Sequence, residues 1–217
     1  MSKNTLEKKY MERSWSKEKH QSYKSDNIDG SVKDFYDFLK TKNVSGSLLD
    51  IGCGNGKNTI FFQDGGFDSL GIDFAQLAIK ICKDKVNRLA NKPKFRAVDI
   101  LGYDSGKEFD VLLDCGCMHH IRRSNWPKYK KTILNNLKVG GYLYIHGISG
   151  GEANKKFPKH PKKRNWIINK KGHYTTFLID KDINRLLGGR FKIKKSFEFK
   201  SQRSPLMVRA FIVQRVK

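Results

Sequence analysis

The sequence lacks long apolar runs, cysteine pairs in a regular framework, and internal repeats. No segment approaches the roughly 18 consecutive apolar residues that a membrane-spanning helix needs, and residues 1–30 are charged and polar, unlike a secretory signal. The four cysteines, Cys53, Cys82, Cys115 and Cys117, do not have the spacing of a secreted disulfide framework, which fits a reducing compartment. We therefore expect a soluble cytoplasmic protein with no membrane partner.

Acidic residues are scarce in the second half of the chain. Residues 1–114 contain 19 Lys or Arg against 17 Asp or Glu, whereas residues 115–217 contain 25 against 4. Nearly all of the net charge of +23 therefore lies in the second half. This asymmetry indicates an anionic partner, which could be nucleic acid, an acidic surface or a charged small molecule. A lysine-rich solubilising surface is the alternative interpretation.

The length of 217 residues fits one compact domain with a substantial core. We predict an N-terminal arm over residues 1–30, followed by the main domain over 31–217. The arm carries Tyr10, Trp15 and Tyr23. Ser31 is the predicted N-cap of the first helix of the domain, because apolar residues at helical spacing follow it up to Leu39.

Short apolar runs then alternate with helical stretches. The predicted strands lie at residues 48–51, 69–72, 95–98, 111–113 and 142–145, and the predicted helices at 57–63, 75–89 and 126–137. This alternation is typical of βαβ units, which form a parallel sheet with helices on both faces. Near the end, Asp180 is the predicted cap of a helix that stops at Gly188. Two strand-like segments follow, at residues 191–199 and 206–216, and their short connection requires an antiparallel hairpin.

The most informative stretch is a glycine-rich turn that follows the first predicted strand. Gly52, Gly54 and Gly56 have no Cβ, so they can adopt positive φ and let a ligand approach the backbone. Asp73 lies about 20 residues further on, where the end of the second strand would place a carboxylate against ribose hydroxyls. The pattern predicts a site for a nucleotide-containing cofactor.

Five motifs in order resemble the class I S-adenosylmethionine-dependent methyltransferases. They are Leu-Asp-Ile-Gly-Cys-Gly-Asn-Gly from residue 49, Gly-Ile-Asp-Phe-Ala from 71, Ala-Val-Asp-Ile from 97, Phe-Asp-Val-Leu-Leu-Asp-Cys-Gly from 109, and Leu-Lys-Val-Gly-Gly-Tyr-Leu from 137. The resemblance covers residues 30–217. It implies an α/β fold with a Rossmann-like doubly wound sheet that is mostly parallel, seven-stranded and closed by an antiparallel terminal hairpin. The hairpin distinguishes this fold from nicotinamide-binding domains.

The resemblance also implies S-adenosyl-L-methionine as the cofactor and S-adenosyl-L-homocysteine as its product. Asp73 would accept hydrogen bonds from both ribose hydroxyls, since a carboxylate only accepts. Other cofactor contacts would come from the glycine turn, from the residues beside the adenine, and from the cleft under the sulfonium. These expected contacts are Asp50, Gly52, Cys53, Gly54, Phe74, Asp99, Ile100, Asp114 and Cys115. Asp50 would lie near the ammonium group of the cofactor.

Two adjacent histidines, His119 and His120, are the candidate catalytic residues. Methyl transfer from a sulfonium depends mainly on placement of the acceptor, and a base is needed only when the acceptor must lose a proton. Either histidine could be that base, or could hydrogen-bond the cofactor or substrate. Cys115 and Cys117 with these histidines also offer zinc ligand types, but their spacing differs from that of zinc knuckles, so no metal is predicted.

Two acceptor classes remain open. The Asn/Asp-Pro-Pro-Tyr/Phe sequence of many N-methyltransferases is absent, and the Asp-x-Gly-x-x-His-His pattern followed by Tyr129 resembles the small-molecule branch that includes thiol and metalloid enzymes. We favour a small-molecule acceptor, S-, O- or N-nucleophilic and anionic, over the alternative of RNA or another nucleic acid. A non-catalytic cofactor-binding protein is disfavoured because the glycine turn and Asp73 are intact. Oligomeric state is not predicted.

A basic insert over residues 150–175 is the predicted lid of the substrate mouth. Its stretch from Gly150 to Thr175 carries eight Lys or Arg against one Glu, interleaved with aromatic residues. Such a segment could hold an anionic group of a small substrate or track an RNA strand, and a solvated loop is the alternative. The expected substrate contacts are Trp15, His146, Trp166 and Tyr174.

Overall fold

The computed structural model describes residues 12, 15, 25–151, 165–170, 173–201 and 205–217. Its helices are α2 (Gly30–Thr41), α3 (Lys57–Asp64), α4 (Gln76–Val86), α5 (Trp126–Asn136) and α7 (Asp180–Leu187), with short 3₁₀ turns η1 (Met118–His120), η2 (Arg123–Asn125) and η3 (Gly188–Arg190). Its strands are β1 (Ser47–Ile51), β2 (Asp68–Asp73), β3 (Lys94–Ala97), β4 (Phe109–Cys115), β5 (Leu137–Ile148), β6 (Trp166–Ile168), β7 (Tyr174–Thr176), β8 (Phe191–Lys200) and β9 (Met207–Arg215).

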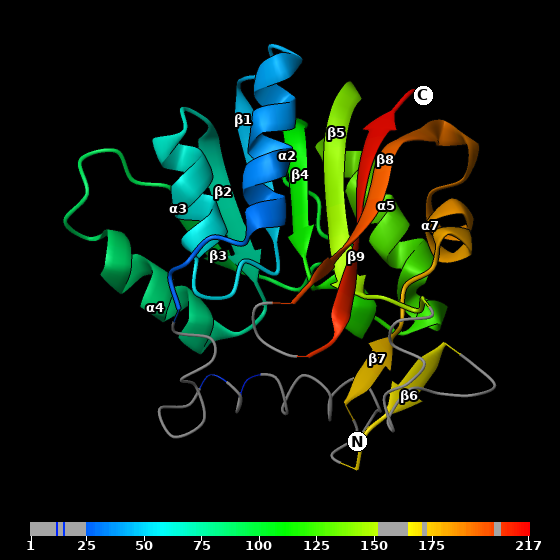
Figure 1. Ribbon diagram of the computed structural model, residues 1–217. Helices are drawn as coiled ribbons and strands as arrows, with labels where there is room; N and C mark the ends of the chain where they lie inside the picture. The colour runs from blue at the N-terminus through cyan, green and yellow to red at the C-terminus, as the bar shows by residue number, and fades with distance from the viewer. Residues whose placement is uncertain (1–11, 13–14, 16–24, 152–164, 171–172, 202–204) are drawn as a thin grey trace.

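Seven strands form the main sheet, in the order β3-β2-β1-β4-β5-β9-β8 (Figure 1). The first five strands in this order are parallel to one another, whereas β9 pairs antiparallel with both β5 and β8. The predicted fold class is therefore confirmed, including the terminal hairpin. The carboxyl ends of the parallel strands meet at one edge of this sheet, which is where ligands bind in open α/β sheets.

Helices pack on both faces of the sheet. On one face α2 and α3 bury Val32, Phe35 and Phe62 against β1, β4 and β5. On the other face α5 and α7 bury residues such as Tyr129 and Ile183. The apolar positions of the strands explain these two layers, because strands covered on both faces need apolar side chains on both. No described helix is long and apolar enough to cross a membrane.

Two helix caps differ from the predicted ones. Asp29, not Ser31, caps α2, since its carboxylate accepts from the backbone N–H of Ser31 at 3.0 Å. At α7 the cap position belongs to Ile179, and Asp180 is the first helical residue. In both cases an acid or hydroxyl lies close in sequence to the true cap, and sequence alone could not choose between neighbouring candidates.

A second, two-stranded sheet, β6 and β7, lies beyond the carboxyl ends of the parallel strands (Figure 1). It falls within the predicted basic lid, which was not expected to contain strands. Residues 152–164 and 171–172 of this lid, and most of the N-terminal arm, lie outside the described residues.

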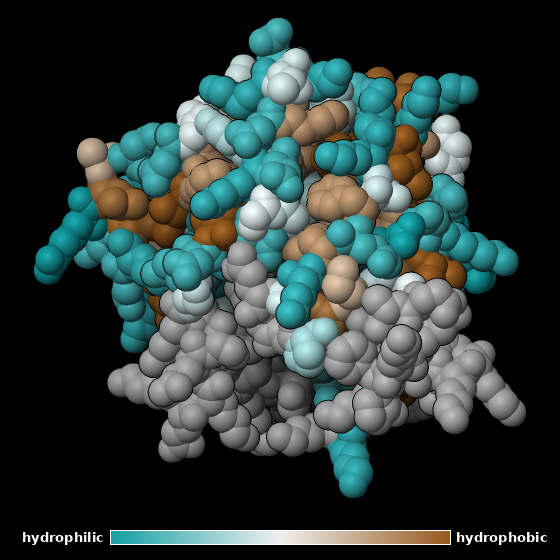
Figure 2. Space-filling view, in the orientation of Figure 1, coloured by the Kyte–Doolittle hydropathy of each residue, from teal (hydrophilic) through white to brown (hydrophobic). Residues whose placement is uncertain are grey.

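The surface of the described residues is mainly hydrophilic on the face that Figure 2 presents. Large hydrophobic side chains are exposed, among described residues, only at Leu89, Val139, Ile168 and Val216. These positions are scattered, which is normal for a water-exposed surface.

Candidate functional site

A cavity of about 470 Å³ lies at the carboxyl ends of the parallel strands. Twelve of the residues singled out from the sequence line it. They are Trp15, Gly52, Cys53, Gly54, Asp73, Phe74, Asp99, Ile100, Cys115, His119, His120 and His146. Four others do not line it: Asp50, Asp114, Trp166 and Tyr174. The fold thus brings together residues that are far apart in sequence, as the topology of the sheet requires.

The glycine turn forms one wall of this cavity. Gly52 and Gly54 have φ of 69° and 57°, which is strained for any residue with a Cβ. A Cβ on Gly52 would lie 2.7 Å from the Cβ of Cys117, and one on Gly54 would lie 3.1 Å from the ring of Trp15. The backbone of this turn, which we call the glycine cradle, is therefore exposed. Side chains at these two positions would fill the space beside it.

Asp73 holds the other side of the same turn. Its Oδ2 accepts from the backbone N–H of Gly54 at 3.1 Å, and its Oδ1 accepts from that of Ala75 at 2.9 Å. Burial raises the pKa of this carboxyl above its usual value, while these backbone hydrogen bonds lower it. Each carboxylate oxygen has two acceptor sites, so both can take a further hydrogen bond from a ligand.

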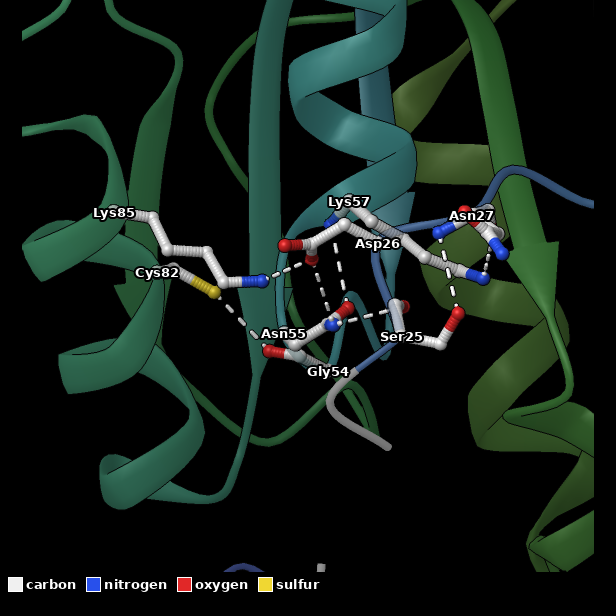
Figure 3. Close-up of polar contacts among 8 residues, drawn as sticks. All are labelled: Ser25, Asp26, Asn27, Gly54, Asn55, Lys57, Cys82 and Lys85. Carbon is white, nitrogen blue, oxygen red and sulfur yellow. Dashed lines mark hydrogen bonds and ion pairs between the residues drawn. The ribbon is translucent and has the colours of Figure 1, made fainter. Parts of the chain in front are cut away.

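The segment that leads into α2 is tied to the outside of the glycine turn (Figure 3). Asn55 donates from Nδ2 to the carbonyl of Ser25 at 3.4 Å and to Asp26 Oδ1 at 3.3 Å. Lys85 forms an ion pair with Asp26, and Lys57 donates to the carbonyl of Asn27. These contacts fix the start of α2 relative to the turn.

Asp50 and Asp114, both predicted cofactor contacts, are buried and do not line the cavity. Asp50 is 1% exposed and accepts from Thr59 Oγ1 at 2.6 Å, and burial raises its pKa to about 7. Asp114 is fully buried, and burial raises its pKa to about 6. It accepts from the hydroxyl of Tyr129 at 2.5 Å and from backbone N–H groups of residues 117 and 118. These carboxyls shape the turns after β1 and β4.

His119 and His120 belong to a chain of hydrogen bonds that runs from the backbone of Ile148 to the backbone of Tyr174. The backbone N–H of Ile148 donates to Nδ1 of His119 at 3.1 Å, so the proton of the neutral His119 ring is on Nε2. Nδ1 of His120 donates to the carbonyl of Tyr174 at 3.1 Å, which leaves Nε2 of His120 as an acceptor. The two Nε2 atoms are 2.7 Å apart, so His119 donates to His120.

Every ring nitrogen of this pair is therefore engaged in the described structure. Burial lowers the pKa of both rings, to about 3 for His120, with neighbouring histidines adding to the effect. Both imidazoles are neutral and have no unused lone pair for an incoming proton. The sequence left proton transfer and positioning open for this pair, and these contacts fit the positioning role.

The β6–β7 hairpin supports the pair from outside the cavity. Tyr174 is 4% exposed; its carbonyl holds His120, and its ring lies beside Trp166 at 5.7 Å and under the guanidinium of Arg122 at 5.3 Å. Both aromatic residues were predicted substrate contacts, and neither lines the cavity. His173, next to Tyr174, does line the cavity.

Several lining residues were not predicted. Among them are Asn55, Lys57, Asn58, Arg122, Asn125 and His173. Arg122 follows the histidine pair by two residues, so its position could have been inferred from the motif. Asn125 and His173 come from turns whose path the sequence pattern does not define.

Known proteins share both the central motifs and the fold. Residues 48–141 match the family model described as a methyltransferase domain. An uncharacterized methyltransferase of Schizosaccharomyces pombe is 26% identical over 110 residues, which is 50% of this chain and 74% of that protein.

Two solved structures have the same fold. One is the Burkholderia thailandensis 1,6-didemethyltoxoflavin-N1-methyltransferase with bound 1,6-didemethyltoxoflavin and S-adenosylhomocysteine, at a TM-score of 0.78 and 16% identity, covering 99% of this chain and 89% of that one. The other is the magnesium protoporphyrin IX methyltransferase of Synechocystis PCC 6803 with bound S-adenosylhomocysteine, at a TM-score of 0.71 and 15% identity, covering 96% and 99%.

Proposed function

We propose that this chain is a class I S-adenosylmethionine-dependent methyltransferase and that it methylates a small-molecule acceptor bound in the cavity beside the histidine pair. The observation that carries the proposal is the cavity itself. Its lining includes the glycine turn with Asp73 and a set of imidazoles from His120, His146 and His173. A volume of about 470 Å³ lies in the range of ligand pockets.

The residues present fit S-adenosyl-L-methionine. The positive-φ glycines leave backbone exposed where a Cβ would clash, and Asp73 keeps acceptor capacity for two hydroxyl donors. Asp73 would hold the ribose, Phe74 would flank the adenine, and Asp99 would accept from the adenine amino group. The backbone of Gly52 and Gly54 would face the methionine part. When bound, the cofactor supplies a methyl group on a sulfonium, which is a good leaving group.

The likeness in fold to enzymes whose bound or named substrates are small molecules supports a small acceptor. Two cationic residues, Lys57 and Arg122, line the cavity and would favour an acceptor that carries negative charge. Arg122 is held over the ring of Tyr174, so its charge stays close to the cavity wall. The acceptor would therefore be a compact anionic molecule.

The first experiment is calorimetric titration of the full chain with S-adenosyl-L-homocysteine, followed by a screen of labelled-methyl transfer to pools of thiols, phenols, amines, carboxylates and RNA. The proposal expects binding of the cofactor product and label in a small-molecule pool. Failure to bind the cofactor product would contradict the proposed function as a whole.

RNA is the second candidate, favoured by the charge of the second half of the chain. Binding to RNA would weaken steeply as salt increases, because counterions are released when lysines and arginines contact phosphates. Replacing Lys162, Lys163 and Arg164 by Ala would flatten that dependence. Label transfer to RNA, with this salt dependence, would replace the small-molecule proposal.

A further inference from the structure

One buried polar atom in the cavity wall has no hydrogen-bond partner among the described residues. This atom is Oδ1 of Asn58, a residue that is 8% exposed and lines the cavity. Folded proteins pair the large majority of their buried polar side-chain atoms, because a buried acceptor without a donor costs free energy. An unpaired acceptor at a cavity wall therefore indicates a donor that a ligand supplies.

Asn58 lies in the first turn of α3, directly after the glycine cradle. The cap residue of α3 is Gly56, which has a φ of 76° and no side chain to cap the helix. Lys57 and Asn58 both line the cavity, so the amino end of α3 is part of the cavity wall. The partial positive charge at this end of a helix favours a negative group, such as a carboxylate.

The family resemblance implied that Asp50 lies near the ammonium group of the cofactor. Asp50 is 1% exposed, and its Oδ2 accepts from Oγ1 of Thr59 at 2.6 Å. Thr59 is the residue after Asn58, so the two neighbours have different surroundings. Of the three described residues Asp50, Asn58 and Thr59, only Asn58 lines the cavity. A direct contact with the ammonium group is therefore open to the amide of Asn58.

An amide is chemically matched to the amino-acid end of the cofactor. The amide oxygen accepts from an ammonium group, and the amide NH₂ group donates to a carboxylate. The methionine part of S-adenosyl-L-methionine carries both of these charged groups. The last torsion of asparagine has a broad energy minimum, so the amide can turn its oxygen to a donor in the cavity at little cost.

We propose that Asn58 is a cofactor-binding residue, and that its side-chain oxygen accepts a hydrogen bond from the ammonium group of the methionine part. The inference rests on the proposed methyl-transfer function and deepens it, because it assigns the amino-acid end of the cofactor to a side chain that the motifs did not single out. Asp73 would hold the ribose at the other end. Recognition of the two ends can therefore be separated by experiment.

The same oxygen should reduce the stability of the protein without its ligand. A buried acceptor without a partner keeps the cost of losing water, and an apolar group of the same shape removes that cost. Leucine is close to asparagine in shape. A binding residue that lowers the stability of the unliganded protein is a known compromise between stability and function.

The test is calorimetric titration of the full chain with three ligands. They are S-adenosyl-L-homocysteine, its analogue in which hydrogen replaces the amino group, and 5′-methylthioadenosine, which lacks the whole amino-acid end. In Asn58→Ala the affinity for S-adenosyl-L-homocysteine should fall about 10- to 100-fold, because a hydrogen bond to a charged group is lost. The affinity for 5′-methylthioadenosine should stay within about twofold of wild type.

The analogue without the amino group identifies the partner atom. Wild-type protein should bind it more weakly than S-adenosyl-L-homocysteine, whereas Asn58→Ala should bind the two nearly alike, because the amide and the amino group are each other's partners. The same loss of affinity in wild type and in Asn58→Ala would show that another group binds the ammonium, and it would overturn the proposal.

Thermal melting without ligand separates binding from folding. Asn58→Leu should melt at the wild-type temperature or above it, while its affinity for S-adenosyl-L-homocysteine falls as in Asn58→Ala. A structural role for the amide predicts the opposite pattern. A lower melting temperature with unchanged affinity would therefore overturn the assignment.

Asn135→Ala is the matched control. Asn135 also lies on a helix and donates from Nδ2 to Asp104 at 3.0 Å, but it does not line the cavity. This variant should bind all three ligands as wild type does. Wild-type affinity for S-adenosyl-L-homocysteine in Asn58→Ala would overturn this inference alone. Failure of the wild-type protein to bind both S-adenosyl-L-homocysteine and 5′-methylthioadenosine would instead overturn the proposed function, so the two failures are distinguishable.

Discussion

The two walls of the cavity are built from different kinds of group. One, the proposed cofactor wall, uses bare backbone and strand ends, namely the glycine turn and Asp73, whose positions follow from local sequence. The other, the proposed acceptor wall, uses imidazoles whose proton positions are set by partners distant in sequence, such as Ile148, 29 residues from His119, and Tyr174, 54 residues from His120. A cofactor common to many enzymes can be bound by a local motif, whereas an acceptor needs contacts assembled from the whole fold.

The largest expected effect is on the cofactor wall. Asp73→Ala should weaken binding of S-adenosyl-L-homocysteine about 100-fold, since two hydrogen bonds to a charged group are lost. Calorimetry measures the affinity, and thermal melting checks that the fold is kept. Asp68→Ala, at the exposed start of the same strand, is the control and should bind normally. Normal binding by Asp73→Ala would show that the two walls do not divide the ligands in this way.

A second prediction concerns the glycine cradle. Gly52→Ala should lower the free energy of unfolding by about 2 kcal/mol, because a positive φ and a close approach to Cys117 both act against a Cβ. Gly66→Ala is matched in its positive φ but has open space around the site, so it should cost less. Equal losses in the two variants, measured by denaturant unfolding, would mean that the cradle adds nothing beyond backbone strain.

A third prediction compares how a buried acid, Asp114, and a buried imidazole, His120, make the stability depend on pH. The pKa of Asp114 is raised to about 6, so the folded state holds a proton that the unfolded state loses above its ordinary pKa of 3.8. The stabilising effect of this bound proton is complete below pH 3.8 and is lost as pH rises towards 6. His120 has the opposite sign: its pKa is lowered to about 3, so stability falls as pH drops from 6.5 towards 3.

The two groups change the stability in opposite directions as pH rises. Without the carboxyl of Asp114, the increase of stability with pH that is due to His120 should therefore be less opposed. In Asp114→Asn the free energy of unfolding should rise more steeply with pH between 4 and 6 than in wild type, by up to about 1.4 kcal/mol per pH unit. Denaturant unfolding across that range measures the slope, which is independent of any uniform loss of stability. An unchanged slope would mean that Asp114 titrates alike in the folded and unfolded chain.

The smallest expected effect is at the start of α2. Asp29→Ala removes the cap and should cost about 1 kcal/mol, whereas Ser31→Ala keeps the bond from its own backbone N–H to Asp29 and should cost less. Thermal melting compares them. A larger loss in Ser31→Ala than in Asp29→Ala would contradict the cap assignment.

Most of the fold could be predicted from the sequence, because the features that define it depend on residues close together in sequence. Each parallel strand is a short apolar run, the glycine turn and Asp73 follow such runs, and the connection after Phe199 is too short for anything but a hairpin. The predicted helix at residues 126–137 matches α5 closely. These features depend on neighbours in sequence, which pattern analysis reads well.

The parts that escaped prediction depend on contacts distant in sequence. Asp50 and Asp114 follow the motif spacing, but their buried carboxyls accept hydrogen bonds from Thr59 and Tyr129 and do not line the cavity. Nothing in the His-His pattern shows that Ile148 and Tyr174 occupy its ring nitrogens. The β6–β7 hairpin has only three residues in each strand, which is too short for a periodic signal.

The order of the sheet has a consequence for synthesis on the ribosome. β5 lies inside the sheet, yet its partner on one side is β9, which is made after β6, β7, α7 and β8. Until Met207–Arg215 has emerged, a nascent chain presents the β5 edge with unpaired backbone groups, and such an edge can pair with other chains. The protein should therefore be most prone to aggregation late in translation, after its cofactor wall has been made but before its sheet can close.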